Sequence, residues 1–406
     1  MLQVRNGVRT DCASHEGGTM LSLFLRRSSP CRTGKVGGWW MAILSIKGAA
    51  TSVAGIPTLA GIDLTVQDGE FCVLAGPSGA GKSTLLRAIA GLEQLDSGTI
   101  EIDGEVVNAW RPHERNVAMV FQTEALLPTA SAFDNIAFSL KARKVPPEDI
   151  EERVKRVAEI LGVADLLHRR PDQLQLAERR RVAIGRAAVR DADVCLMDEP
   201  LANVDLDARD AMRAEIKQLH REFPTTKLFV THDALEATTL GERVVLMRAG
   251  RIEQEGSPQA LFDRPLTRFV AGFFGRPKMN FLRGTLSRSE AVDLIRLEAS
   301  DINVKLPPGR IPKEAADGLA VILGVRPEHM MRAVRASPAD GAFRHEAEIE
   351  SLQPVGTRTY ATFKMGGAPV VAELQAHDVS LPGERIPIDI NLKRAAIFDA
   401  ETEKAL

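Results

Sequence analysis

The residues best suited to chemistry lie in one glycine-rich stretch, G-P-S-G-A-G-K-S-T, at positions 76–84. Its glycines let the backbone curl so that several N–H groups point at one anion. The lysine places a positive charge on the β- and γ-phosphates of a nucleotide, and the serine hydroxyl can coordinate Mg²⁺. The pattern therefore predicts a phosphate-binding loop with Ser83 as a metal ligand, formed by Gly76, Pro77, Ser78, Gly79, Ala80, Gly81, Lys82, Ser83 and Thr84.

The segments on both sides of this loop have the patterns that it needs. Residues 71–75 are a short apolar run typical of a buried strand, and residues 83–89 place apolar side chains on one helical face. A strand, a glycine loop and a helix N-terminus together form an anion site. A chance glycine-rich turn is the simpler alternative, and the flanking pattern disfavours it.

Two acids follow a second apolar run, at residues 194–197. Asp198 can hold Mg²⁺ through water, and Glu199 is placed to accept a proton from an attacking water. Two acids at a strand end are often surface residues. Beside a phosphate loop, and just before Pro200, the catalytic interpretation is favoured.

With further motifs, the chain resembles the ATPase subunits of ABC importers, in particular the maltose/glycerol-phosphate-type carbohydrate branch, over about residues 42–406. The motifs are V-F-Q ending at Gln122, D-E-P-L-A-N-V-D at 198–205, T-H-D at 231–233, G-V-R-P-E-H at 324–329, and the runs 268–274 and 277–282. The resemblance implies an α/β P-loop NTPase, namely an ABC-type nucleotide-binding domain with a helical subdomain. A small all-β, OB-like regulatory domain would follow it.

The resemblance also implies roles, cofactors and partners. Gln122 would touch Mg²⁺ and the lytic water, His232 would contact the γ-phosphate of ATP, and Asp205 would lie in a loop crossing the dimer interface. Partners would be two integral membrane permease subunits, a second ATPase subunit and, indirectly, a periplasmic or extracellular solute-binding protein. The chain would sit peripherally at the cytoplasmic face of the bacterial inner membrane.

The segment that matches the family's L-S-G-G-Q signature departs from that pattern. The following run R-R-R-V-A-I-G-R-A at 179–187 fixes the alignment, so the slot reads Leu174-Gln175-Leu176-Ala177-Glu178. Leu176 adds bulk and Glu178 adds negative charge where the family binds a phosphate, which predicts weaker binding. In the alternative interpretation, Gln175 supplies the hydrogen bond and the neighbouring arginines offset Glu178.

A second departure concerns the adenine base. The family places an aromatic ring there, and its spacing from the phosphate loop leads to Val53; no Phe, Tyr or Trp occurs between Trp40 and Phe71. Valine keeps an apolar contact but loses ring stacking, so the sequence predicts lower nucleotide affinity than in a typical member.

The length of 406 residues predicts two or three domains. Residues 1–40 are expected to be a disordered leader or a mis-assigned start, with Met41 as the natural start and a targeting tail as the alternative. Residues 41–276 would be the nucleotide-binding domain, with a mostly parallel sheet and a helical subdomain at about 123–187. Residues 277–406 would be the β domain.

Composition narrows the function classes. The net charge of -2 gives no global basic field for nucleic acid, and no apolar run is long enough to span a membrane. Cys72 and Cys195 lie in apolar runs and are expected to be buried and reduced.

Three functions remain for comparison. The first is an ATPase that energises uptake of a carbohydrate-like solute such as a sugar, a polyol or glycerol phosphate. The second is a nucleotide-binding partner with weak turnover of its own in an asymmetric heterodimer; a homodimer stays possible. The third, an ABC-type ATPase acting on DNA or ribosomes, is disfavoured because long heptad arms and a basic tail are absent from the sequence.

Overall fold

The structure, a computed structural model, describes residues 35–36, 39–40, 42–289, 292–335, 337–378 and 381–406. Most of residues 1–40 and Met41, on which the leader and start-site predictions fall, lie outside the described residues. In that stretch the structure describes two short strands, β1 (Lys35–Val36) and β2 (Trp39–Trp40), which pair antiparallel.

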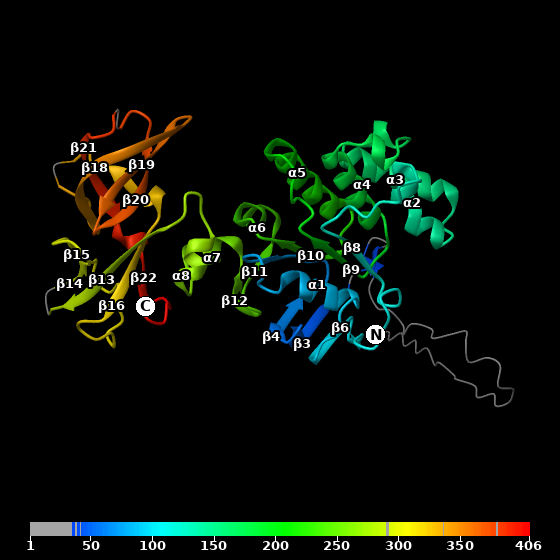
Figure 1. The fold of residues 1–406 in the computed structure, drawn as a ribbon, viewed down its shortest axis with the longest axis horizontal. Coiled ribbons are helices and arrows are strands. Elements are labelled where there is room, and N and C mark those ends of the chain that lie inside the picture. The colour runs from blue at the N-terminus through cyan, green and yellow to red at the C-terminus, as the bar shows by residue number, and fades with distance from the viewer. Residues whose placement is uncertain (1–34, 37–38, 41, 290–291, 336, 379–380) are drawn as a thin grey trace, which may run out of the picture.

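A six-stranded sheet with the order β12-β11-β5-β10-β9-β8 forms the centre of the N-terminal part of the chain (Figure 1). All neighbouring strands in it are parallel except the edge pair β11 and β12, as the alternation of strands and helices predicts. Its strands are β5 (Phe71–Ala75), β8 (Val117–Val120), β9 (Val194–Asp198), β10 (Thr226–Thr231), β11 (Arg243–Arg248) and β12 (Arg251–Gly256).

Helices cover one face of this sheet, where they bury a large apolar cluster with alternate side chains of the strands. They are α2 (Ala132–Ala142), α3 (Pro147–Ile160), α4 (Leu176–Ala188), α5 (Leu206–Glu222), α6 (Ala234–Leu240) and α7 (Pro258–Asp263). Pro147 stands at the first position of α3, where its missing N–H has no cost, so α2 and α3 are separate helices.

The opposite face packs against α1 (Lys82–Ala90) and a separate antiparallel sheet with the order β4-β3-β6-β7. Its strands are β3 (Leu44–Val53), β4 (Ile56–Val66), β6 (Ser97–Ile102) and β7 (Glu105–Val106). β3 extends beyond the apolar core, where its polar half pairs with β4.

The C-terminal part is all β and lies at the end of the molecule opposite α2 and α3 (Figure 1). It holds two five-stranded sheets, β15-β14-β13-β16-β22 and β17-β21-β18-β19-β20, around one apolar core. The strands are β13 (Asn280–Arg288), β14 (Asp293–Leu297), β15 (Asn303–Lys305), β16 (Ala320–Val325), β17 (Met330–Arg332), β18 (Ala342–Val355), β19 (Arg358–Met365), β20 (Ala368–Gln375), β21 (Arg385–Asn391) and β22 (Ala396–Asp399).

A buried arginine joins the two parts. Arg326, just after β16, is 2% exposed and donates to the carbonyl oxygens of Phe274 and Phe262 at 2.8 and 2.7 Å. Its guanidinium also lies 3.5 Å from the centre of the Phe262 ring. Phe274 follows α8 (Arg268–Phe273), so the β domain is anchored to the last helices of the nucleotide-binding part.

Two further observations concern the chain as a whole. Cys72 and Cys195 are free thiols in the core, as expected. Among the described residues, no helix is both long and apolar enough to cross a membrane.

Candidate functional site

The phosphate loop lies between β5 and α1, as its sequence predicts. Lys82 is buried, and its Nζ donates to the carbonyl oxygens of Gly76 and Pro77, each at 2.8 Å. Burial lowers the pKa of Lys82, while the charges of Glu199 and Asp198 oppose that change. The loop backbone therefore surrounds the Lys82 side chain. Lys82 places a positive charge at the amino end of α1, near Asp198 and Glu199.

Two positions of the loop must be glycine because neighbouring backbone leaves no room for a side chain. A Cβ at Gly76, where φ is +148°, would lie 2.3 Å from the carbonyl oxygen of Met247. At Gly81, where φ is +97°, it would lie 2.5 Å from that of Thr58. Glycine is required at both because the backbone conformation and the space exclude a side chain. The hairpin of β3 and β4 thus closes directly over the loop.

Asp198, at the end of β9, meets the loop at Ser83, whose Oγ donates to Asp198 Oδ1 at 2.9 Å. Burial raises the pKa of Asp198, and this hydrogen bond opposes the increase. A hydroxyl and a carboxylate in contact are oxygen donors of the kind that Mg²⁺ prefers. Ser83 and Asp198, two of the three predicted metal ligands, therefore fit Mg²⁺, whereas Gln122 contacts Glu199.

The three residues predicted to be catalytic meet at Glu199. His232 Nδ1 lies 3.1 Å from Glu199 Oε1, and Gln122 Nε2 donates to Glu199 Oε2 at 3.4 Å. Gln122 follows β8 by one residue and His232 follows β10 directly, so parallel strands bring all three to one edge of the sheet. Glu199 itself has a φ of +46°, a left-handed conformation that is uncommon for a non-glycine residue and aims its side chain at this edge.

Val53 stands at the tip of the hairpin, where it pairs with Ile56 across the turn Ala54-Gly55. The two side chains are 51% and 70% exposed. Directly opposite residues share a face of an antiparallel pair, so Val53 and Ile56 form one aliphatic surface. Sequence spacing alone led to Val53 and missed Ile56; the tight turn between them was the available signal.

The signature slot forms the amino end of α4, and Gln175 is its N-cap residue. Glu178 Oε2 accepts a hydrogen bond from the Gln175 backbone N–H at 2.7 Å. The nearby arginines are engaged elsewhere: Arg179 donates to the Leu174 carbonyl at 2.7 Å, and Arg181 binds both carboxylate oxygens of Glu215 at 2.8 Å. A carboxylate of the chain itself therefore occupies the helix N-terminus.

Comparison with known proteins shows the family to which the chain is similar, over most of its length. The ABC transporter family matches residues 59–202, and the MalK OB fold domain matches residues 275–330. The multiple sugar-binding transport ATP-binding protein MsmK of Streptococcus mutans is 41% identical over 357 residues, which cover 85% of this chain and 93% of MsmK.

Two more relatives align over a longer stretch. The sn-glycerol-3-phosphate import ATP-binding protein UgpC of Cupriavidus pinatubonensis is 42% identical over 378 residues, which cover 90% of this chain and 100% of UgpC. The sulfoquinovosyl glycerol transport ATP-binding protein SmoE of Agrobacterium fabrum is 41% identical over 370 residues, with coverages of 90% and 100%.

Proposed function

The chain belongs to the ATP-binding proteins of the ABC transporter family, and from this premise we propose that it hydrolyses ATP to energise import of a carbohydrate-like solute. The solute class, a sugar, a polyol or glycerol phosphate, follows the names of the relatives and the OB fold at the C-terminus. The observation that carries the proposal is the meeting of Lys82, Asp198 and Glu199 at one edge of the sheet.

The proposed roles follow from these positions. ATP enters the loop of residues 76–84, and Lys82 exchanges its two carbonyl contacts for the β- and γ-phosphates. Ser83 and Asp198 hold Mg²⁺, which neutralises the phosphate charge, with Gln122 as a further contact to the metal. Val53 and Ile56 offer the adenine an apolar surface without a ring.

Hydrolysis then depends on the group around Glu199. Its carboxylate accepts the proton of the attacking water, and Gln122 helps to orient that water. His232 Nδ1, now 3.1 Å from Glu199 Oε1, is placed to hold this carboxylate and to reach the γ-phosphate through its other ring nitrogen. Both contacts fix the base at the position where water must be activated.

The partners follow from the family. We expect two permease subunits in the membrane, a solute-binding protein outside, and this chain at the cytoplasmic face of the bacterial inner membrane. Phe121, next to Gln122 in the chain, and Leu127 are each 37% exposed, and Phe138 on α2 is 51% exposed. We propose that these exposed apolar side chains of the helical region contact a permease. Residues 41–276 would form the catalytic domain and residues 277–406 the regulatory one.

We further propose that the assembly is an asymmetric heterodimer. In this family each site combines the phosphate loop of one chain with the signature segment of the other. Glu178 places a carboxylate at the amino end of α4. Arg181 is paired with both oxygens of Glu215, whereas Arg179 bonds a neutral carbonyl and keeps its charge, so the arginines offset Glu178 only in part. This favours the weak-signature interpretation. Turnover would then occur mainly at the site built on Lys82, against a partner with the usual signature.

The test uses the reconstituted transporter and its ATP turnover. Lys82→Ala should abolish tight MgATP binding, because the phosphates lose their charged partner. Glu199→Gln should keep binding and stop hydrolysis at its site. In a heterodimer, Glu199→Gln in this chain should reduce turnover far more than the equivalent change in the partner. Unchanged turnover with Glu199→Gln would refute its role as base, and brisk turnover with two copies of this chain would refute the heterodimer.

A further inference from the structure

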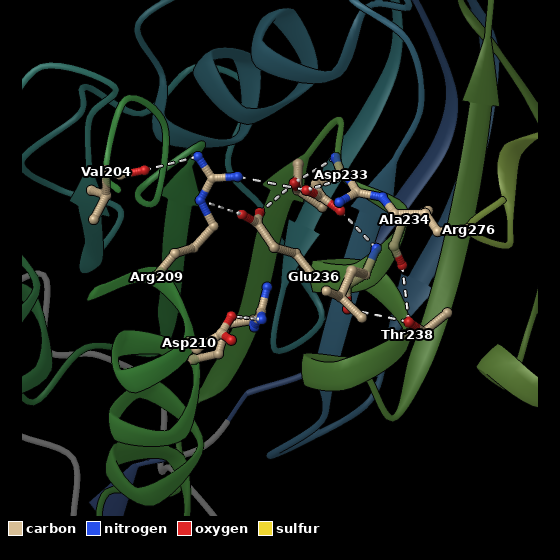
Figure 2. A network of polar contacts seen from close by, with 11 residues as sticks. Val204, Arg209, Asp210, Asp233, Ala234, Glu236, Thr238 and Arg276 are labelled. Atoms are coloured by element: carbon tan, nitrogen blue, oxygen red, sulfur yellow. Dashed lines mark hydrogen bonds and ion pairs between the residues drawn. The ribbon is translucent and has the colours of Figure 1, made fainter. Parts of the chain in front are cut away.

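A network of charged residues surrounds Asp233, the residue after His232, and includes Arg276 from the junction between the two domains (Figure 2). Asp233 uses both of its carboxylate oxygens. Oδ1 accepts from the Leu235 N–H at 2.7 Å and caps α6, and Oδ2 accepts from Arg276 Nη2 at 2.9 Å. Arg276 is the last residue before Pro277 in the junction between the domains. A residue of the junction therefore holds residues 231–233, which we call the histidine loop.

The other members of the network come from the helices beside the loop. Arg209 on α5 lies 3.6 Å from Asp233 Oδ2 and 3.9 Å from Glu236 Oε1, and its Nη2 donates to the Val204 carbonyl at 3.0 Å. Asp233 and Glu236 are both buried, and burial raises the pKa of Glu236. Two neighbouring buried acids require positive charge, which Arg209 and Arg276 supply from opposite sides (Figure 2).

The junction itself is held by the β domain. Arg326 donates to the Phe274 carbonyl at 2.8 Å, and a Cβ on Gly275 would lie 2.9 Å from Arg326 Nη1. Gly275 is therefore pressed against an arginine of the β domain, and the next residue is Arg276. A displacement of Arg326 with its domain moves the backbone that carries Arg276, and hence the contact with Asp233.

We propose that Arg276 is a positioning residue for ATP hydrolysis, through which the C-terminal β domain sets the place of His232. The chain of contacts runs from Arg326 through Phe274 and Gly275 to Arg276, and from Asp233 to the adjacent His232. When the contact is made, the histidine loop stays where His232 Nδ1 reaches Glu199 at 3.1 Å. When the β domain shifts, Asp233 loses Arg276 and retains Arg209 and the Leu235 N–H, so the segment that carries His232 is held less firmly. This inference rests on the proposed role of His232.

The first experiment measures ATP turnover of the reconstituted transporter with Arg276→Gln. Arg276 is 65% exposed, so its ion pair is worth at most about 1 kcal/mol, which is about fivefold in rate. We expect kcat to fall about threefold to fivefold while KM for ATP changes less than about twofold. Arg276→Lys should restore most of the loss, and the difference should shrink at high salt.

Lys278→Gln is the matched control, because Lys278 is exposed, lies in the same junction and forms no ion pair among the described residues. It should leave kcat unchanged. Equal losses in Arg276→Gln and Lys278→Gln, or a rise in KM without a fall in kcat, would overturn the proposal.

A second experiment asks whether Arg276 acts through the histidine. His232→Ala alone tests the proposed role of His232 and should reduce turnover strongly. Adding Arg276→Gln to it should reduce turnover no further, whereas a full additional loss would overturn the inference and leave the role of His232 intact. Hydrogen exchange on the full chain gives a readout without catalysis: Arg276→Gln should speed exchange in α6 and not in the β domain. Unchanged exchange in α6 would contradict the proposal.

Discussion

Glu178→Gln is the sharpest test of the proposed asymmetry, because it removes a charge and keeps the local structure. The Glu178 side chain caps α4 by accepting the Gln175 N–H at 2.7 Å. Glutamine at the third helical position accepts the same hydrogen bond through its carbonyl oxygen. The variant should therefore fold with the same helix start and differ only in the negative charge presented to a phosphate.

The magnitude follows from the geometry of one helical turn. We take about 7 Å, slightly more than one helical pitch, as the separation between the Glu178 carboxylate in the first turn of α4 and an anion bound at the helix end. Two like unit charges at that distance repel by about 0.6 kcal/mol at the dielectric constant of water and by about 2.4 kcal/mol at an effective value of 20. Removing the charge should strengthen ATP binding by about threefold to fiftyfold.

The assay must isolate the site that uses this signature segment. Glu199→Gln in this chain silences the site built on Lys82, so the residual turnover of a heterodimer comes from the partner's phosphate loop and Leu174 to Glu178 of this chain. Adding Glu178→Gln in that background should lower KM for ATP by about tenfold at low salt, near the middle of the range above. At high salt the gain should become smaller, because ions screen the repulsion.

Glu152→Gln on α3 is the matched control, since it also removes one exposed acid from the helical region but lies away from the slot. It should leave KM unchanged. If Glu178→Gln altered KM by less than twofold, or no more than Glu152→Gln did, the charge of Glu178 would not be what weakens this site.

Three further predictions concern the base site, a buried lysine and the domain junction. Val53→Trp should tighten ATP binding by ~1–2 kcal/mol, as measured by calorimetry. Val106→Trp on β7 of the same sheet should not, and equal affinities for Val53→Trp and wild type would show that Val53 is not at the base. Burial lowers the pKa of Lys227 to about 8. Because the unfolded chain then binds more protons than the folded one between about pH 8 and 10.5, stability should rise with pH. From pH 7 to 9, wild type should gain about 1.4 kcal/mol relative to Lys227→Met in denaturant unfolding, and parallel pH profiles would contradict this. Arg326→Met should destabilise the chain by ~2–4 kcal/mol, because two buried carbonyls lose their donor. Thermal unfolding measures this loss, and an unchanged midpoint would refute it.

The sequence was most informative where contiguous residues determine the chemistry. The loop at 76–84 has the glycines that set its backbone conformation, the lysine that supplies charge and the serine proposed as a metal ligand. Its structure therefore follows from the local sequence. The meeting of Asp198, Glu199 and His232 was also predictable, because all follow strands of one parallel sheet and such strands end at the same edge. The resemblance then extended these local inferences to domain order and function.

Other features depend on long-range packing that no periodic pattern records. Arg276 and Asp233 stand in segments whose sequences give no sign of their contact, and the pairing depends on how the β domain holds Gly275. Ile56 joins Val53 in the proposed adenine-binding surface only through the register of β3 and β4. The antiparallel sheet over one face was not predicted, because β3 pairs with β6, whose residues lie more than 40 positions further along the chain.

The start of α4 shows how local stability and phosphate binding conflict in this chain. A helix N-terminus has unpaired N–H groups, which a bound phosphate or a side chain of the chain itself can satisfy. Glu178 satisfies the Gln175 N–H, so α4 begins stably without any ligand. The same carboxylate is an anion where a second anion would have to bind, and Leu176 adds bulk beside it. A segment that caps itself in this way is suited to supporting an assembly. In the proposed heterodimer, the chemistry would be left to the site in which Lys82, Asp198 and Glu199 face a partner whose helix end is still open.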